Sequence, residues 1–249
     1  MLSPSDLKRY LERIQYAGPR SRTAATLRAL HVAHLQNVPF ENLSVRRGEP
    51  IVLEEKRLFE KVVSRRRGGF CYELNGAFAA LLEALGFQVS RLAGRVGPTG
   101  IDFDHMAVRV ELDEPWLADV GFGDCFVEPL RLNAREPQAG GDGRRYRLEA
   151  TAGGLLLTRE HGAAWERQYE LGLNPWPLPA FEGGCRHHAT SPDSPFTRKT
   201  IVSRATEHGR VTLSERKLLI TERGVRTETE LQDDAAFTQA LRGHFGIAL

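Results

Sequence analysis

The 249-residue sequence has almost no net charge, although 27% of its residues are charged. Its 34 Lys and Arg residues are balanced by 32 Asp and Glu residues, which leaves a formal net charge of +2 at pH 7. Domains that bind nucleic acids are usually strongly basic, so this balance argues against a dedicated nucleic-acid binder. Intrinsic disorder requires few apolar residues and a large charge imbalance. With 41% hydrophobic residues, the chain is expected to fold as an ordinary globular protein.

Long apolar runs are also missing. No stretch approaches the ~20 apolar residues that a membrane-spanning helix needs. The first 16 residues contain no apolar core of the kind found in secretory signals. We therefore expect a cytoplasmic protein without a membrane partner.

Cysteine is scarce. The three cysteines, Cys71, Cys125 and Cys185, are an odd number with wide gaps, which does not match a disulfide framework. Reduced thiols are the expectation for a cytoplasmic protein. Cys125 and Cys185 have the features of small core residues. Cys71 has an unusual local context and is a candidate nucleophile.

The pattern of apolar residues predicts three successive regions. The first third reads as helical, the middle as short antiparallel strands joined by turns, and the end as strands followed by a helix. A stretch rich in Pro, Gly and Ser, residues 174–195, is the best linker candidate. Helices are expected from residue 4 and over 23–36, 54–64, 70–85 and 233–244, and strands over 89–96, 106–112, 116–120, 146–150, 155–159, 164–171, 200–205, 210–221 and 225–231.

These elements indicate an α+β protein. We expect an N-terminal helical bundle over 1–86, a central antiparallel β-barrel over 87–185 and a small α/β region over 186–249. The bundle would carry the candidate nucleophile, and the barrel its partners.

Cys71 lies in the run Arg66-Arg67-Gly68-Gly69-Phe70-Cys71-Tyr72-Glu73-Leu74-Asn75-Gly76. The two glycines allow a sharp turn before a helix and place Cys71 in its first turn. Free N–H groups and the positive end of the helix dipole favour a thiolate there. A thiolate is the reactive form of cysteine, and a nearby N–H group would stabilise an oxyanion.

A nucleophilic cysteine needs a histidine, and that histidine needs a carboxylate that orients it. Of the eight histidines, His105 is the best candidate, because it opens a predicted strand and so has a rigid position. His31 and His34 are expected on a helix surface. The pair His187-His188 near Cys185 is not expected to bind a metal, because adjacent side chains point in different directions.

Asp119 is the carboxylate candidate. It lies among apolar neighbours in a predicted strand, where an unpaired charge would be costly. His105 and Asp119 flank a predicted turn at 113–115, so two antiparallel strands would place them side by side. Asp102 and Asp104 compete for this role, but residues so close in sequence to His105 rarely face it.

The run from Arg67 to Gly76 resembles the active-site signature of the arylamine N-acetyltransferases. Other segments resemble further motifs of this family, in the same order along nearly the whole chain. These are Val38–Leu43, His105-Met106, Ala118–Gly123, Ser194–Phe196 with Ile201–Arg204, and Leu241–Ile247. Asp124 and Cys125 depart from the family pattern, in which small residues are commoner there.

The resemblance implies a helical bundle, a β-barrel and an α/β lid, with a cysteine-protease-like catalytic core. It implies a Cys71–His105–Asp119 triad and a ping-pong transfer of acetyl from acetyl-CoA to an arylamine or hydrazine, with a role in xenobiotic metabolism and no metal. By motif position, the aromatic acceptor would be bound by Phe40, Val96, Phe103, Phe122 and Phe196, and coenzyme A by Gly123 and Thr190.

Three alternatives remain open at this stage. An amide synthase of the same fold would release a polyketide chain from a carrier protein as a macrolactam. A hydrolase of the cysteine-protease or transglutaminase class would use the same triad on a peptide. A non-catalytic binding protein would need none of the three residues. The sequence also leaves open whether the chain forms a homodimer.

Overall fold

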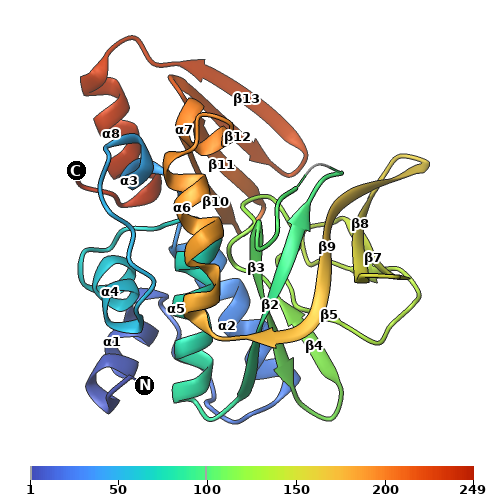
Figure 1. Ribbon diagram of the computed structural model, residues 1–249. Helices are drawn as coiled ribbons and strands as arrows, with labels where there is room; N and C mark the ends of the chain where they lie inside the picture. Colours follow the sequence, from blue (N-terminus) through green and yellow to red (C-terminus); the bar gives the residue numbers. More distant parts are fainter. Residues whose placement is uncertain (1, 99) are drawn as a thin grey trace.

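A computed structural model describes residues 2–98 and 100–249; Met1, where the predicted 1–86 region begins, and Thr99 lie outside them. Figure 1 shows helices on one side, a strongly curved sheet on the other, and a second sheet with its own helix above both. This arrangement confirms the predicted α+β class. The described helices are α1 (Pro4–Arg13), α2 (Ala24–Asn37), α3 (Leu43–Arg46), α4 (Glu55–Phe59) with a following π-helical turn (Glu60–Ser64), α5 (Cys71–Ala84), a 3-10 turn (Leu178–Phe181) leading into α6 (Glu182–Thr190), α7 (Pro195–Arg198) and α8 (Asp234–Phe245).

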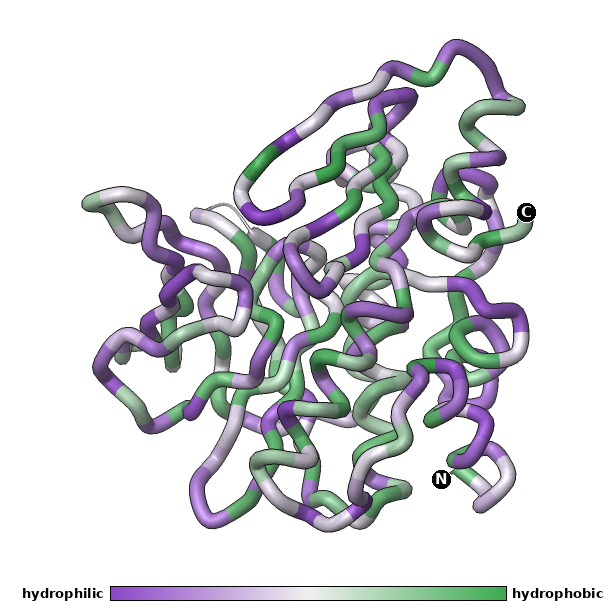
Figure 2. The backbone as a smooth tube through the Cα atoms, turned by 180° about the vertical axis from the view of Figure 1, so that it is seen from behind, coloured by the Kyte–Doolittle hydropathy of each residue, from purple (hydrophilic) through white to green (hydrophobic). Residues whose placement is uncertain are grey.

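The helical part is organised around α5, whose residues Cys71 to Leu82 are all buried. A helix that is apolar on most of its circumference must be covered on several sides. Side chains of α1, α2 and α4 pack around it in one continuous core, and hydrophobic segments concentrate in the interior of the molecule (Figure 2). The predicted helix start at Ser3 is confirmed, because its hydroxyl accepts the Asp6 N–H at 3.2 Å.

The larger sheet is an antiparallel, nearly closed barrel, as predicted. Its two outer strands are joined by the side chain of Gln138, which accepts the Arg131 N–H at 2.8 Å and donates to the Arg131 carbonyl at 3.0 Å. The Gln138 side chain thus makes the hydrogen bonds to Arg131 that backbone pairing of the two outer strands would make in a fully closed barrel. The strand order is β5 (Leu130–Arg131), β4 (Pro115–Ala118), β3 (His105–Glu111), β2 (Gln88–Val96), β9 (Ala164–Trp176), β8 (Gly154–His161), β7 (Arg145–Thr151) and β6 (Gln138–Ala139).

The smaller sheet combines both ends of the chain. Its first strand comes from the helical part, where Phe40 pairs with Ser203 and Glu41 with Val202. The single strand expected over 210–221 is wrong, because Glu215 has φ +51° and the chain reverses there into two strands. The order is β1 (Phe40–Glu41), β10 (Ile201–Thr206), β11 (Gly209–Ser214), β12 (Lys217–Glu222) and β13 (Val225–Glu230).

The linker expected over 174–195 is also wrong. This stretch contains the end of β9, the 3-10 turn and α6. Gly184 lies inside α6, where the helix passes close to Phe103. A Cβ atom at this position would be 2.2 Å from the Phe103 carbonyl oxygen, so only glycine fits. The glycine therefore allows close helix packing and does not mark a flexible joint. The three-region division at residues 86 and 185 stays a prediction.

Within the described ranges, none of the helices combines the length and the apolar character that crossing a membrane requires.

Candidate active site

Cys71 is the first residue of α5, and the chain before it is held tightly. The Glu73 carboxylate accepts the Phe70 N–H at 3.2 Å and binds Lys61 Nζ at 2.6 Å. Gly68 passes so close to the helical part that a Cβ atom would lie 1.8 Å from the Pro39 carbonyl oxygen. These contacts fix the first turn of α5, in which the Glu73 N–H donates to the Phe70 carbonyl at 3.1 Å.

Arg67, in the same loop, forms a buried ion pair with Glu41. Its Nε lies 2.9 Å from Glu41 Oε1, and the other oxygen of Glu41 accepts the Leu43 N–H at 2.7 Å. Gly69 O also accepts the Glu41 N–H at 2.8 Å. The Val38–Leu43 segment therefore supports the loop that leads to Cys71.

His105 and Asp119 lie side by side, as the predicted turn between their strands requires. His105 opens β3, and Asp119 follows β4, its antiparallel neighbour. His105 Nε2 is 2.8 Å from Asp119 Oδ2, and both side chains are buried. Cys71 lies close enough to the same imidazole to contribute to raising its pKa. Because Nε2 contacts Asp119, Nδ1 is the ring nitrogen left for the sulfur.

Asp119 is surrounded by donors. Oδ1 accepts from Asn75 Nδ2 at 2.8 Å and from the Gly121 N–H at 3.0 Å. Oδ2 accepts from His105 and from the Tyr169 hydroxyl, each at 2.8 Å. Burial raises the pKa of Asp119, but the neighbouring His105 and these hydrogen bonds outweigh it and hold that pKa below its usual value.

The same contacts act on His105 in the opposite direction. Burial lowers its pKa, but the charge and hydrogen bond of Asp119, together with Cys71, raise it to about 10. An imidazolium next to Cys71 is therefore the favoured form at neutral pH. This arrangement places a protonated imidazole beside a cysteine, the kind of side chain that can attack a carbonyl carbon.

Asn75 and Tyr169 were not predicted as site residues. Asn75 is part of the motif that includes Cys71, so its place near the site was available from the sequence. Its side-chain oxygen also accepts the Val120 N–H at 2.9 Å. Tyr169 lies on β9, far from Cys71, His105 and Asp119 in sequence, and strand alternation alone did not single it out.

His31 and His34 are not on the surface, contrary to prediction. Both are fully buried, because α2 is covered by α5 and by the loop after β4. His31 Nε2 accepts the Asp119 N–H at 2.9 Å, and Nδ1 donates to the Val127 carbonyl at 2.7 Å. Burial lowers the pKa of His31 to about 4. Neutral His31 thus holds the backbone of Asp119 in place by accepting its N–H.

Cys71 and His105 open into a cleft of about 930 Å³ between the barrel and the smaller sheet. Of the residues expected to bind substrates, Phe40, Val96, Phe122, Phe196 and Gly123 line this cleft. The roles assigned to them stay predictions.

Phe103 and Thr190 are absent from the described lining of the cleft. Phe103 has φ +58°, and its ring contacts Trp176 and Phe181. The Thr190 hydroxyl donates to the Arg186 carbonyl in the preceding turn of α6. The roles expected for Phe103 and Thr190 in substrate and coenzyme A binding also stay predictions.

Asp104 does not compete for His105. Its Oδ1 binds His188 Nε2 at 2.7 Å, and its Oδ2 accepts the Val96 N–H at 2.9 Å. His188 Nδ1 lies 3.1 Å from Ser194 Oγ. This second imidazole–carboxylate pair borders the cleft and ties α6 to the start of β3.

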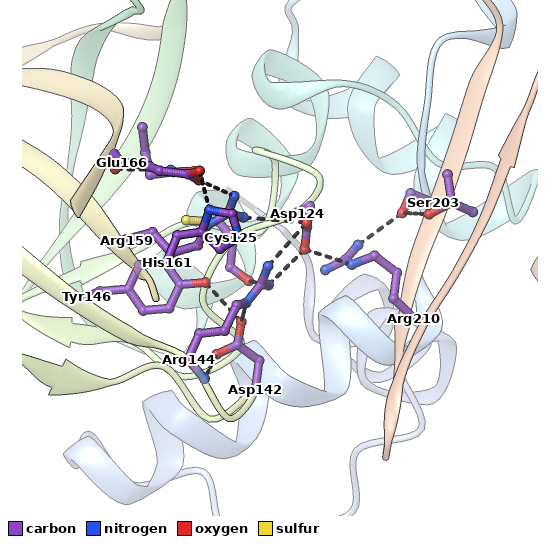
Figure 3. A network of polar contacts seen from close by, with 12 residues as sticks. Asp124, Cys125, Asp142, Arg144, Tyr146, Arg159, His161, Glu166, Ser203 and Arg210 are labelled. Atoms are coloured by element: carbon purple, nitrogen blue, oxygen red, sulfur yellow. Dashed lines mark hydrogen bonds and ion pairs between the residues drawn. The ribbon is translucent and has the colours of Figure 1, made fainter. Parts of the chain in front are cut away.

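The far end of the cleft carries a charged network centred on Asp124 (Figure 3). Arg144 and Arg159 reach this carboxylate from the barrel, at 2.7 and 3.5 Å, and Arg210 reaches it from β11 at 3.1 Å. Burial raises the pKa of Asp124, but the hydrogen bond from Arg144 and the charges of the three arginines outweigh it and lower that pKa. The network therefore joins the two sheets across the cleft.

The other two cysteines are buried and free. Burial raises the pKa of Cys125 and of Cys185. Among the described residues, no group of His, Cys, Asp and Glu side chains could hold a metal ion.

Comparison with known proteins gives consistent results. A family model described as N-acetyltransferase matches residues 23–249. The arylamine N-acetyltransferase of Mycolicibacterium smegmatis is 34% identical over 255 residues, covering 98% of this chain and 92% of the relative. The structure of the Mycobacterium marinum arylamine N-acetyltransferase in complex with CoA is 35% identical with a TM-score of 0.90, covering 97% of this chain and 92% of that chain. Proansamycin X synthase of Amycolatopsis mediterranei is 32% identical over 246 residues, covering 93% and 94%.

Proposed function

The chain belongs to the arylamine N-acetyltransferase family, and from this membership we propose that it moves an acetyl group from acetyl-CoA to an arylamine or hydrazine through a thioester on Cys71. The observation that carries the proposal is the contact between His105 and Asp119, 2.8 Å apart, beside a cysteine at the start of a helix. We assign the catalytic triad to Cys71, His105 and Asp119.

In the first half-reaction, the Cys71 thiolate attacks the carbonyl carbon of the acetyl-CoA thioester. The oxyanion that forms lies near the first-turn N–H groups of α5, which stabilise it. The bond to the coenzyme A sulfur breaks, and His105 gives its proton to the departing thiolate. The products are acetyl-Cys71, coenzyme A and neutral His105.

In the second half-reaction, the acceptor nitrogen attacks acetyl-Cys71. Neutral His105 takes the proton that the nitrogen loses, and the bond between carbon and the Cys71 sulfur breaks. The enzyme returns to its thiolate–imidazolium form. Asp119 stays ionised throughout, orients His105 and stabilises its charged form.

Different residues of the cleft bind the acceptor and coenzyme A. We assign Phe40, Val96, Phe122 and Phe196 to the aromatic ring of the acceptor, since ring faces and edges attract one another. Phe40 and Phe196 support this assignment with ring centroids 5.9 Å apart. We assign Gly123 to coenzyme A, because its φ of +93° keeps a turn beside the cleft free of side chains.

The test is the intact mass of the pure protein after mixing with acetyl-CoA and no acceptor. We expect a gain of one acetyl group in the wild type and in Cys185→Ala, and no gain in Cys71→Ala. Addition of an aniline should remove the acetyl group. A gain that persists in Cys71→Ala would refute the assignment of the nucleophile.

The similarity to proansamycin X synthase makes a carrier-bound acyl donor the second candidate. The same mass experiment distinguishes it. An amide synthase would gain no acetyl group from acetyl-CoA but would take an acyl chain from a carrier-protein thioester. A hydrolase would lose its acyl group to water at the same rate with and without the aniline.

A further inference from the structure

A second cavity, of about 190 Å³, lies on the other side of β10 from the active-site cleft. Ser203 lines the cleft, and the next residue, Arg204, lines this cavity, because successive residues of a strand point to opposite faces. The cavity is therefore separate from the site proposed for catalysis.

Its walls are strongly basic. Arg13 comes from the end of α1, Arg66 from the loop before Cys71, Arg204 from β10 and Arg242 from the last turn of α8. The described residues that line the cavity include no Asp or Glu. Four guanidinium groups from four separate segments thus converge without a carboxylate among them.

Backbone carbonyls satisfy only part of these groups. Arg13 donates three hydrogen bonds to carbonyls, among them Val62 O at 2.9 Å and Asn37 O at the end of α2. Arg204 donates two to His244 O in the last turn of α8 and one to Gln36 O. A guanidinium has five N–H donors, so each of these two retains two.

Arg66 and Arg242 are both exposed, and their side chains form no hydrogen bond or ion pair within residues 2–98 and 100–249. The carbonyl ends of α2 and α8 each contribute roughly half a negative charge. That is well short of four positive charges, so the cavity retains an excess of positive charge.

The excess affects the most deeply buried arginine. Burial and the charges of Arg66 and Arg204 together lower the pKa of Arg13 to about 10, although the nearby Tyr10 acts in the opposite direction. Like charges beside a buried guanidinium are costly unless a counterion offsets them.

The backbone around the cavity is also unusual. Gln15 and Arg66 have φ values of +56° and +51°, in the left-handed region that non-glycine residues rarely adopt. Both line the cavity. Residues in such conformations cluster at ligand-binding positions, where surrounding structure holds them in place.

We propose that this cavity binds a phosphate group, held by Arg13, Arg66, Arg204 and Arg242. Guanidinium groups bind phosphate through paired N–H···O bonds. The cavity volume fits a free phosphate ion, and the second source of the same chemistry is the phosphate of a nucleotide. The bound group would join α1, the loop before Cys71, β10 and α8.

The experiment is isothermal titration calorimetry of the full chain with inorganic phosphate, at constant pH and ionic strength. The test variant is Arg66→Gln/Arg242→Gln, in which both exposed arginines are removed. The matched control is Arg20→Gln/Arg186→Gln, which removes two exposed arginines that line neither cavity. Circular dichroism spectra verify that all three proteins are folded.

We expect the dissociation constant for phosphate to rise at least tenfold in the test variant and to stay at the wild-type value in the control. Phosphate should also raise the melting temperature of the wild type and of the control, but not of the test variant. No phosphate binding by the wild type, or equal binding by the test variant, would overturn the proposal.

A second titration uses adenosine 3′,5′-bisphosphate and distinguishes the two sources. Tighter binding of the bisphosphate than of phosphate, lost in the test variant, supports the site with a nucleotide as its ligand. Tighter binding of phosphate, lost in the same variant, supports the site with the free ion as its ligand.

Discussion

Tyr169 and His105 meet at a single oxygen atom, because each places a donor 2.8 Å from Asp119 Oδ2. Their rings also contact each other, with centroids 4.8 Å apart. Tyr169 comes from β9, on the opposite side of β2 from the strand that carries His105. Donors from two separate strands of the barrel, β3 and β9, thus hold the same carboxylate oxygen.

Replacing Tyr169 by Phe removes this hydrogen bond and keeps the ring. We expect the free energy of unfolding to fall by about 1.5–3 kcal/mol, as for other hydrogen bonds to charged groups, and the rate of Cys71 acetylation to fall about tenfold. Tyr146→Phe is the control, because its hydroxyl binds Asp142 at 2.9 Å, outside the triad. Equal acetylation rates in the two variants would contradict a role for Tyr169 in positioning Asp119.

Asp119→Asn should preserve the fold and nearly abolish catalysis. An amide cannot stabilise the charged form of His105, and in a comparable triad this change costs about 10⁴ in kcat. We expect a loss of roughly 10³–10⁴ in the single-turnover rate of acetylation, measured by rapid quenching. Asp113→Asn, in the exposed turn between β3 and β4, should keep the wild-type rate. Near-wild-type kinetics of Asp119→Asn would remove Asp119 from the triad.

The low pKa of His31 leads us to expect that the free energy of unfolding falls in acid. Its pKa is about 4 in the folded protein, below the ordinary 6.5, so the unfolded chain binds the proton more readily. The stabilisation from neutral His31 is complete above about pH 6.5 and is lost as the pH falls towards 4. In urea unfolding at pH 7 and pH 4.5, the stability advantage of wild type over His31→Gln should shrink by about 2 kcal/mol. An advantage that is independent of pH would contradict this account.

Loss of the Asp124 charge is expected to change the selectivity of the enzyme for charged over neutral acceptors. Removing its charge with Asp124→Asn leaves Arg159 and Arg210 less balanced at the end of the cleft. The ratio of kcat/KM for 4-aminobenzoate over aniline should then rise about three- to tenfold at low salt and fall back at high ionic strength. Asp193→Asn, which removes another carboxylate lining the cleft, provides the matched comparison. A ratio that changes equally in both variants would show that the Asp124 network has no specific effect.

Local chemistry explains why part of the site was predictable. Glycines before Cys71 and a histidine and an aspartate flanking a turn are patterns over short stretches of chain. The contact between His105 and Asp119 follows directly from the pairing of two neighbouring strands. Much of the barrel was predictable for the same reason, since short turns join β3 to β4, β7 to β8 and β8 to β9.

Other features depend on what packs against an element. His31 and His34 were predicted on a helix surface because nothing in the sequence of α2 shows that other segments cover it on several sides. Gly184 suggested a linker, but its lack of a side chain allows α6 to approach the Phe103 carbonyl. Tyr169 reaches Asp119 only because the curved sheet brings β9 beside β2. Such effects arise from the whole fold.

The pairing of β1 with β10 has a consequence for the order in which the molecule can be assembled. A ribosome delivers Cys71, His105 and Asp119 within the first half of the chain, but Tyr169 and the cleft residues between Pro195 and Thr212 emerge later. Until then, Phe40 and Glu41 have no strand to pair with. A nascent chain therefore holds Cys71, His105 and Asp119 well before it holds the β10 and β11 residues that complete the cleft beside them.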